Sequence, residues 1–399
     1  MALGDYQKIT RVVSGKPFGN GSDGAYSSAT IPTMVNESCS GAAAGTALTC
    51  GSTGLTDGDI ILIHQSRGTG VGQWEVNKVA SGGGTTSIVL SEALNYTYTD
   101  SGASQAQVTV IKQYTDVTVE TGTWTLPGWG GDQGGILTFA AKGTLTVTGS
   151  INGNGSVGTN GDGTSPSAGG GYLGGVSDSG ANQQAGQGEG TSGARNGEST
   201  SANGSGAGGG YSGNGQASGG GGGNGAAGSD GTDQASATVK GAGGGSAGSA
   251  DLLNAVFGGA GGGSATQSDP DTGSGGNGGG AIFVFCKDAS LSGVTSVNGG
   301  AGGSSGSTAA DNIGGGGGAG GSVIIICATA TLGTNKITST AGAGGVGFIA
   351  GGAGGVGRNA VHHSGTVTGT TNPTFSDTED SSLVETTASS GATGSFHFM

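Results

Sequence analysis

The feature that most constrains the fold of this chain is an abrupt junction between two opposite kinds of sequence. Residues 314–327, GGGGGAGGSVIIIC, run an almost pure glycine tract directly into a β-branched segment. Glycine loses the most backbone freedom on folding, whereas β-branched residues are stiff and favour strands. A strand that must be buried is thus tied, without a linker, to residues that resist ordering. The glycine tract therefore needs an ordered partner of its own.

The same junction recurs in a repeat. Segments 134–155, 279–303 and 320–345 each begin with Gly-Gly, continue into a strand, turn, form a second strand and return to glycine. Because successive strand residues point to opposite faces, matched positions should form rows on one face. These rows are Leu137, Ile282 and Val323, then Phe139, Val284 and Ile325, then Ala141, Cys286 and Cys327.

The opposite face of these strands is also apolar in the second and third copies. It carries Phe283 and Phe285 in one copy and Ile324 and Ile326 in the other. Strands that are apolar on both faces are typical of sheets covered on both sides. We expect a neighbouring β-layer to cover one face and the glycine tracts, which are nearest in sequence, to cover the other.

Extended glycine has a regular form that suits this role. Polyproline-II-like strands have three residues per turn, and without Cβ atoms they can lie close enough to hydrogen-bond laterally on several sides. Ordering glycine costs about 1–2 kcal/mol per residue in backbone entropy, so dense pairing is required. The sequence therefore predicts a layered slab of polyglycine-II strands, in which Gly316→Val should be as damaging as Ile325→Asp.

Composition excludes several other classes. The chain has 99 glycines but only 6 prolines among 399 residues, which does not fit collagen, and its strand-like apolar runs with 10% charged residues argue against disorder. The net charge of −14 makes nucleic acid an improbable partner. No run is apolar enough for membrane insertion, and residues 1–28 lack the pattern of a signal peptide. These features fit a virion component synthesised in the host cytoplasm.

The segment before the repeats reads as conventional β-sheet. Short alternating runs separated by turn residues predict strands at 59–65, 73–80, 87–94, 107–114 and 116–126, with Trp74 and Trp124 in the core. The fold class is thus all-β with almost no helix: a small barrel or sandwich, then a body of β-rungs and polyglycine-II layers. We divide the chain into an N-terminal arm (1–20), a β-domain and possible docking module (21–130), the glycine-rich body (131–365) and a C-terminal tail (366–399), whose Phe396 and Phe398 could fold back or insert into a partner.

Larger side chains within the glycine-rich body are candidates for recognition. Packed glycine rods would place their connecting loops at the ends of the slab, and loops on a rigid scaffold commonly carry binding residues. Aromatic groups among small polar residues suit such a contact surface. For the segment 252–257, capping of the slab is an equally good interpretation. The candidates are Tyr172, Leu173, Tyr211, Leu252, Leu253, Phe257, Phe348 and Ile349.

Glycine tracts such as AGGGYLGG and GAGGGYSGNG, alternating with polar and aromatic loops, resemble the tip adhesins of T-even-type phage long tail fibres. Separately, the segment from PFGNGSDG to SINGNG looks like the front half of glycine-rich proteins of phage and bacterial genomes. The first resemblance implies a polyglycine-II sandwich whose loops bind a host receptor, a protein or a polysaccharide. The partners would be that receptor and other virion proteins or copies of this chain. A self-assembling fibre or sheath protein is the alternative.

Sequence signals for enzymatic chemistry are weak. The many GxGxxG-like strings arise by chance at this glycine content, and no metal-ligand spacing or cofactor motif is present, so we expect no cofactor. The strongest enzyme alternative is a polysaccharide depolymerase with paired carboxylates. Its candidates are Asp377, Glu379 and Asp380, or Asp269 with Asp271.

The four cysteines form two pairs without CxxC spacing. Cys39 and Cys50 bracket a short loop and could form a disulfide in an oxidising exterior. Cys286 and Cys327 lie at the ends of apolar strands, where a role as small buried hydrophobic residues is favoured.

Overall fold

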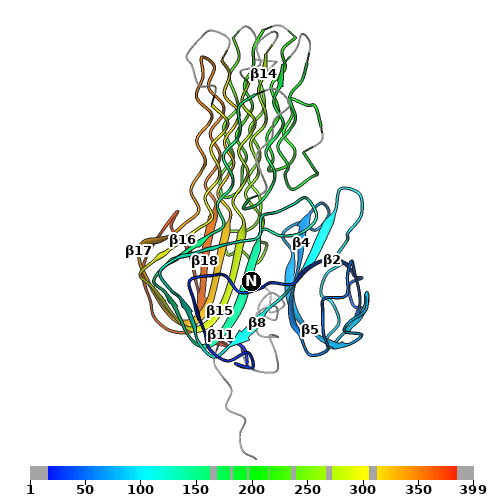
Figure 1. Ribbon diagram of the computed structural model, residues 1–399, viewed down its shortest axis with the longest axis vertical. Coiled ribbons are helices and arrows are strands. Elements are labelled where there is room, and N and C mark those ends of the chain that lie inside the picture. The colour runs from blue at the N-terminus through cyan, green and yellow to red at the C-terminus, as the bar shows by residue number, and fades with distance from the viewer. Residues whose placement is uncertain are drawn as a thin grey trace, which may run out of the picture.

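The computed structural model describes residues 17–161, 169–179, 183–195, 197–213, 215–234, 240–266, 272–304 and 312–383. Within these ranges the chain forms three parts: a barrel, a stack of parallel strands, and a long column of glycine-rich strands that rises from the stack (Figure 1). Every regular element there is a strand, which confirms the all-β class. None of the described elements is a helix able to cross a membrane.

The barrel is closed by six antiparallel strands in the order β2-β3-β6-β5-β4-β7. Alternating residues such as Ile61, Ile63 and Val108 fill its interior. The prediction of an N-terminal barrel or sandwich is therefore confirmed as a barrel. Its strands are β2 (Asn36–Ser40), β3 (Ala47–Cys50), β4 (Ile60–Arg67), β5 (Trp74–Ser81), β6 (Ser87–Leu90) and β7 (Gln105–Val110).

The stack consists of parallel strands in which each rung lies on the one before it. Its first rung holds β8 (Lys112–Tyr114), β9 (Val117–Val119) and β10 (Thr123–Thr125), with β1 (Tyr26–Ser28) paired to β9. The next rungs are β11 (Ile136–Val147) with β12 (Ser150–Asn152), β15 (Ala281–Leu291) with β16 (Val294–Ser296), and β17 (Ser322–Thr338). The last are β18 (Arg358–His363) with β19 (Val367–Asn372), and β20 (Ser376–Glu379).

The register of the stack follows the repeat. Leu137 pairs with Ile282, which pairs with Val323, and the rows that contain Phe139 and Ala141 continue in the same way. These rows face the interior of the stack, together with Val117, Trp124 and Leu332. The short second strands β12 and β16 turn the chain around this interior, so the rungs themselves enclose it.

The opposite face of the rungs is not covered by glycine, and that expectation is wrong. Phe283, Phe285, Ile324 and Ile326 pack against the barrel and against loops of the glycine-rich body. The covering side chains include Leu62 and Trp74 of the barrel and Tyr172, Leu252 and Phe257 of the body. Large side chains can bury apolar area here, whereas glycine has no side chain with which to do so.

The glycine strands continue from the ends of the rungs and hydrogen-bond to one another. In tract 314–321, amides that are three residues apart donate to the same neighbouring strand, so three strands accept in turn. Gly315 and Gly318 donate to Gly303 and Gly300. Gly316 and Ala319 donate to Gly262 and Gly259, and Gly317 and Gly320 donate to Gly352 and Gly355. Its carbonyls accept from three further strands, through Gly276, Gly342 and Gly222. This period is the signature of three residues per turn, so the predicted polyglycine-II packing is present. A two-residue pair, β13 (Asp178–Ser179) with β14 (Ala265–Thr266), lies near the far end (Figure 1).

The structure moves three of the predicted boundaries. The first rung, β8 to β10, lies inside the segment assigned to the β-domain, so Trp124 is buried in the stack, and Trp74 lies between barrel and stack. Phe18, placed in the arm, is buried. Strands β19 and β20, placed in the tail, are rungs of the stack. Phe396 and Phe398 lie outside the described residues.

Candidate functional site

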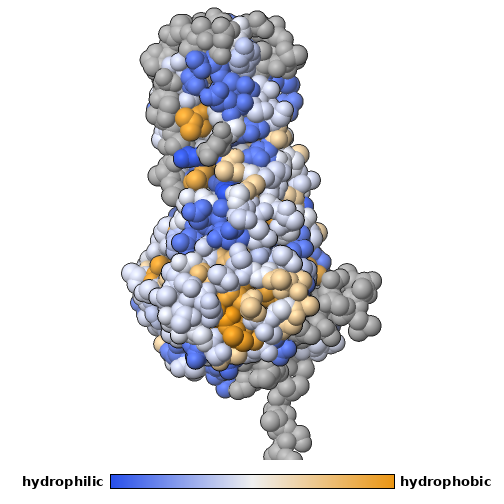
Figure 2. Space-filling view, turned by 90° about the vertical axis from the view of Figure 1, so that its right-hand side faces the viewer, coloured by the Kyte–Doolittle hydropathy of each residue, from blue (hydrophilic) through white to orange (hydrophobic). Residues whose placement is uncertain are grey.

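The far end of the glycine column carries exposed apolar side chains. Phe348 is 54% exposed and Val346 is 65% exposed, next to Ile349, which pairs with Ile313 at this end of the column. In Figure 2, most of the visible side of the column is white to blue, and the largest apolar area in this view lies below the column, on the lower part of the molecule. Exposed side chains of this size therefore stand out at the end of a column built from small residues.

Four of the eight predicted contact residues are buried, and for these the assignment is wrong. Tyr172, Leu252 and Phe257 lie in the cluster between barrel, stack and column, and Ile349 is 5% exposed. Leu173, Tyr211 and Leu253 are half-buried. The sequence analysis placed these groups at exposed loop ends because packed glycine rods were expected to leave room for larger side chains in the loops that connect them. Their neighbours come from segments distant in sequence.

An aromatic cluster joins the barrel to the column. The ring centroids of Tyr172 and Phe257 are 5.4 Å apart, and that of Trp129 is 5.3 Å from Phe257. Trp74 of β5 donates a hydrogen bond from Nε1 to the carbonyl of Leu252 at 2.9 Å. We call this region the seam. It holds the barrel and the column in one fixed arrangement, because its aromatic and hydrogen-bonded contacts are directional.

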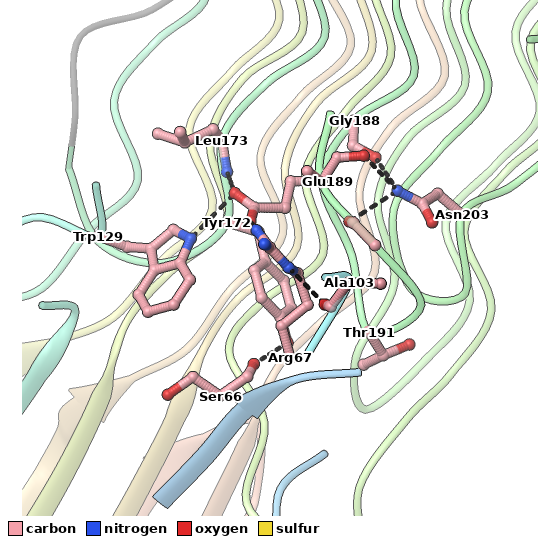
Figure 3. A network of polar contacts seen from close by, with 12 residues as sticks. Ser66, Arg67, Ala103, Trp129, Tyr172, Leu173, Gly188, Glu189, Thr191 and Asn203 are labelled. Carbon is pink, nitrogen blue, oxygen red and sulfur yellow. Dashed lines mark hydrogen bonds and ion pairs between the residues drawn. The ribbon is translucent and has the colours of Figure 1, made fainter. Parts of the chain in front are cut away.

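A buried ion pair lies at the centre of the seam (Figure 3). The guanidinium of Arg67, at the end of β4, contacts the carboxylate of Glu189 in the column. Glu189 also accepts hydrogen bonds from Trp129 Nε1 at 2.9 Å and from the amide of Leu173 at 3.1 Å, and the hydroxyl of Tyr172 donates to the carbonyl of Ser66. Burial raises the pKa of Glu189, and Arg67 opposes this rise. The sequence signal for this pair was a charged residue inside a glycine tract, and our sequence reasoning missed it.

His64 of β4 forms a second polar link across the seam. Its Nε2 lies 2.8 Å from the carbonyl of Ala255, and its Nδ1 lies 2.9 Å from Ser66 Oγ. The carbonyl can only accept, so Nε2 carries the proton and Nδ1 can accept from the hydroxyl. Burial lowers the pKa of His64 to about 4, which keeps the ring neutral at physiological pH.

A small polar hollow lies beside β13, toward the far end of the column. Its volume is about 210 Å³. It combines carboxylate, guanidinium and amide groups, which suit hydrogen bonding to a polar surface more than the binding of an apolar ligand. Its lining comprises Val176, Ser177, Asp178, Gln184, Gly186, Arg195 and Glu198.

Two of the candidate carboxylates of the depolymerase alternative have structural partners. Asp377 Oδ1 lies 2.7 Å from His363 Nε2, and Asp380 accepts from the amide and hydroxyl of Ser382. Glu379 is exposed on the edge strand β20. Asp269 and Asp271 lie outside the described residues. In the described part of the chain, no group of three or more His, Cys, Asp or Glu side chains is arranged to hold a metal ion.

All four cysteines have free, buried thiols in this structure. Cys39 and Cys50 are directly opposite each other on β2 and β3. Cys286 and Cys327 are neighbours on β15 and β17 and face the interior of the stack, as expected for small buried hydrophobic residues.

Comparison of the chain with protein-family models, with curated proteins and with solved structures found no match.

Proposed function

We propose that this protein is a non-enzymatic, tail-associated surface protein of a phage virion that recognises a host-cell receptor with the far end of its glycine column. The observation that carries the proposal is the three-residue hydrogen-bond repeat of the column. Because every strand of the column interior bonds to neighbours on several sides, the column is stiff along its length. A stiff support with loops at its end suits the presentation of a contact surface.

Two further observations support a contact role for this end. Phe348 and Val346 are exposed there, and the polar hollow around Asp178 and Arg195 lies toward the same end. A large exposed apolar group beside adaptable polar groups is a common composition for recognition surfaces. At the base, the seam fixes the barrel, which is then available for attachment to other virion proteins.

The test is competition between purified protein and phage for susceptible cells. We expect the protein to bind these cells and to block infection, and the double variant Val346→Ser/Phe348→Ser to lose at least about tenfold in affinity, as for an apolar hot spot. Val294→Ser is the matched control, because Val294 is 40% exposed but lies on β16 in the stack.

Each outcome is informative. Unchanged competition by the double variant, or an equal loss with Val294→Ser, would refute the assignment to the far end. Self-association that rises with protein concentration and disappears in the double variant, without binding to cells, would favour the self-assembling fibre. Loss of host polysaccharide chain length on incubation would favour the depolymerase.

A further inference from the structure

A second hollow, distant in sequence from the polar hollow of β13, lies where the last glycine strand meets the end of the stack. Its volume is about 420 Å³. One wall is the strand that leads through Val356 into Arg358 of β18, and the other is the connection from β19 to β20. Its lining includes Val356, Arg358, Thr374, Phe375 and Ser376. We call it the Arg358 hollow.

The walls of this hollow are held in place by buried polar contacts. Asn359, which is 3% exposed, donates from Nδ2 to the carbonyl of Pro373 at 2.8 Å and accepts from Ser339 Oγ at 3.1 Å. Phe375 packs partly against the core of the stack. The connection therefore has a fixed position relative to β18, and the hollow is preformed.

Arg358 supplies an unpaired positive charge in this hollow. Among the described residues its guanidinium makes one hydrogen bond, from Nε to the carbonyl of Ala247 at 3.1 Å, and no ion pair. Partial burial lowers the pKa of Arg358, although Asp251 nearby opposes this. The terminal N–H groups form a planar fork that matches a carboxylate or a phosphate oxygen pair.

We propose that the Arg358 hollow is a binding site for an oxyanion carried on a sugar-sized organic group, such as a uronic acid or a sugar phosphate. The fork of Arg358 binds the oxyanion. The ring of Phe375 and the side chain of Val356 form an apolar wall against which the carbon skeleton packs, and Thr374 and Ser376 offer hydroxyl groups. A few convergent polar groups on an apolar wall are typical of small-molecule sites. This inference does not rest on the proposed function, because the hollow is not part of the far end of the column.

The experiment titrates the purified full-length protein with glucuronate, glucose 6-phosphate and neutral glucose, and follows binding by calorimetry and by the side-chain Nε–H signal of arginine in NMR. We expect at least one of the two anions to bind and glucose to bind at least about tenfold more weakly, since a charge-assisted bidentate pair is lost. Preference for glucuronate identifies a carboxylate site, and preference for glucose 6-phosphate identifies a phosphate site.

Variants locate the site. Arg358→Gln should weaken anion binding at least about tenfold. Arg358→Lys keeps the charge but loses the planar fork, so its affinity should lie between those of the wild type and Arg358→Gln. Lys287→Gln is the control, because it removes one positive charge from an exposed position on β15 that lies outside this hollow. Equal binding of all three sugars, no binding of either anion, or loss of binding in Lys287→Gln instead of Arg358→Gln would overturn the proposal. If Arg358→Gln fails to fold, the comparison of Arg358→Lys with the wild type decides.

Discussion

The close packing of the glycine column leads to a specific prediction for substitutions at Gly316. A Cβ atom at this position would overlap the carbonyl oxygen of Gly220 and would lie 3.2 Å from the amide nitrogen of Gly221. All of these contacts are backbone, so no side chain can rotate away to make room. The strand that contains Gly220 would have to move away from the tract 314–321.

The size of the effect follows from the hydrogen bonds that hold this strand. Movement would break the bonds from Gly222 N to Gly317 O and from Gly262 N to Gly220 O, both 2.9 Å long. Each broken bond leaves a buried amide and a buried carbonyl unpaired, which costs about 2 kcal/mol of stability. Alanine has less backbone freedom than glycine in the unfolded chain, and this offsets about 0.7 kcal/mol of that cost. Gly316→Ala should therefore destabilise the protein by about 3 kcal/mol, and Gly316→Val by more.

Gly245 offers a matched control within the same column. Its amide also donates to a neighbouring strand, at 2.8 Å from Gly204 O, but a Cβ there would meet only that oxygen at 3.4 Å. Gly245→Ala should therefore stay within about 1 kcal/mol of the wild type. Ile325→Asp, which places a carboxylate in the interior of the stack, should be as damaging as Gly316→Val.

The assay is unfolding in guanidinium chloride followed by tryptophan fluorescence, with hydrogen exchange of the amides of tract 314–321. All three tryptophans are fully buried, at the seam and in the stack, so fluorescence reports on both. If Gly316→Ala and Gly245→Ala had the same stability, close packing of the glycine strands would not be what holds the column together, and the reasoning would fail.

Three further predictions concern the seam and the barrel. Acid should weaken the seam, because the pKa of His64 is lowered from 6.5 to about 4. Between these pH values the imidazole stays neutral in the folded protein but is protonated in the unfolded chain. About 3 kcal/mol of stability should therefore be lost as the pH falls from 6.5 to 4. Urea titrations across this range should show a smaller loss for His64→Gln, and an identical loss would contradict this assignment. Glu189→Gln should cost about 3–5 kcal/mol because it leaves the buried guanidinium of Arg67 without a counter-charge. The double variant Arg67→Met/Glu189→Gln should recover part of that loss in thermal unfolding, and purely additive losses would exclude coupling. Cys39 and Cys50 should form a disulfide when the chain folds under oxidising conditions, detected by peptide mapping without reductant. Oxidation of the folded protein should be slow at neutral pH because burial raises the pKa of Cys50 to about 12 and also raises that of Cys39, and rapid native-state oxidation at pH 7 would contradict this.

The repeat was readable from the sequence because strand pairing in a parallel stack preserves side-chain rows. Alignment of three segments placed Leu137, Ile282 and Val323 in one row, and the strands pair in that register. The glycine strands were predictable for a related reason, since tracts without side chains can pair their backbones laterally with neighbours on several sides. Both signals are local or periodic, so one chain is sufficient to show them.

The site was less predictable. Tyr172, Leu252 and Phe257 were correctly singled out as unusual in their glycine surroundings, but they bury themselves against the barrel instead of facing a receptor. Their partners, such as Trp74 and Phe283, lie far away in sequence and carry no periodic relation to them. The Arg67–Glu189 pair was missed for the same reason, because a contact across 122 residues leaves no spacing signal.

The sequence by itself determined that the chain is all-β, that its rungs repeat with Cys286 beside Cys327, and that its glycine is ordered by hydrogen bonds, because each follows from residue type and period. Only the tertiary structure decided what covers the second face of the rungs. Glycine pairs well but buries little apolar surface, so the phenylalanines and isoleucines of that face are covered by the side chains of the barrel and the seam. The glycine strands were thereby left to extend away from the stack and form the column.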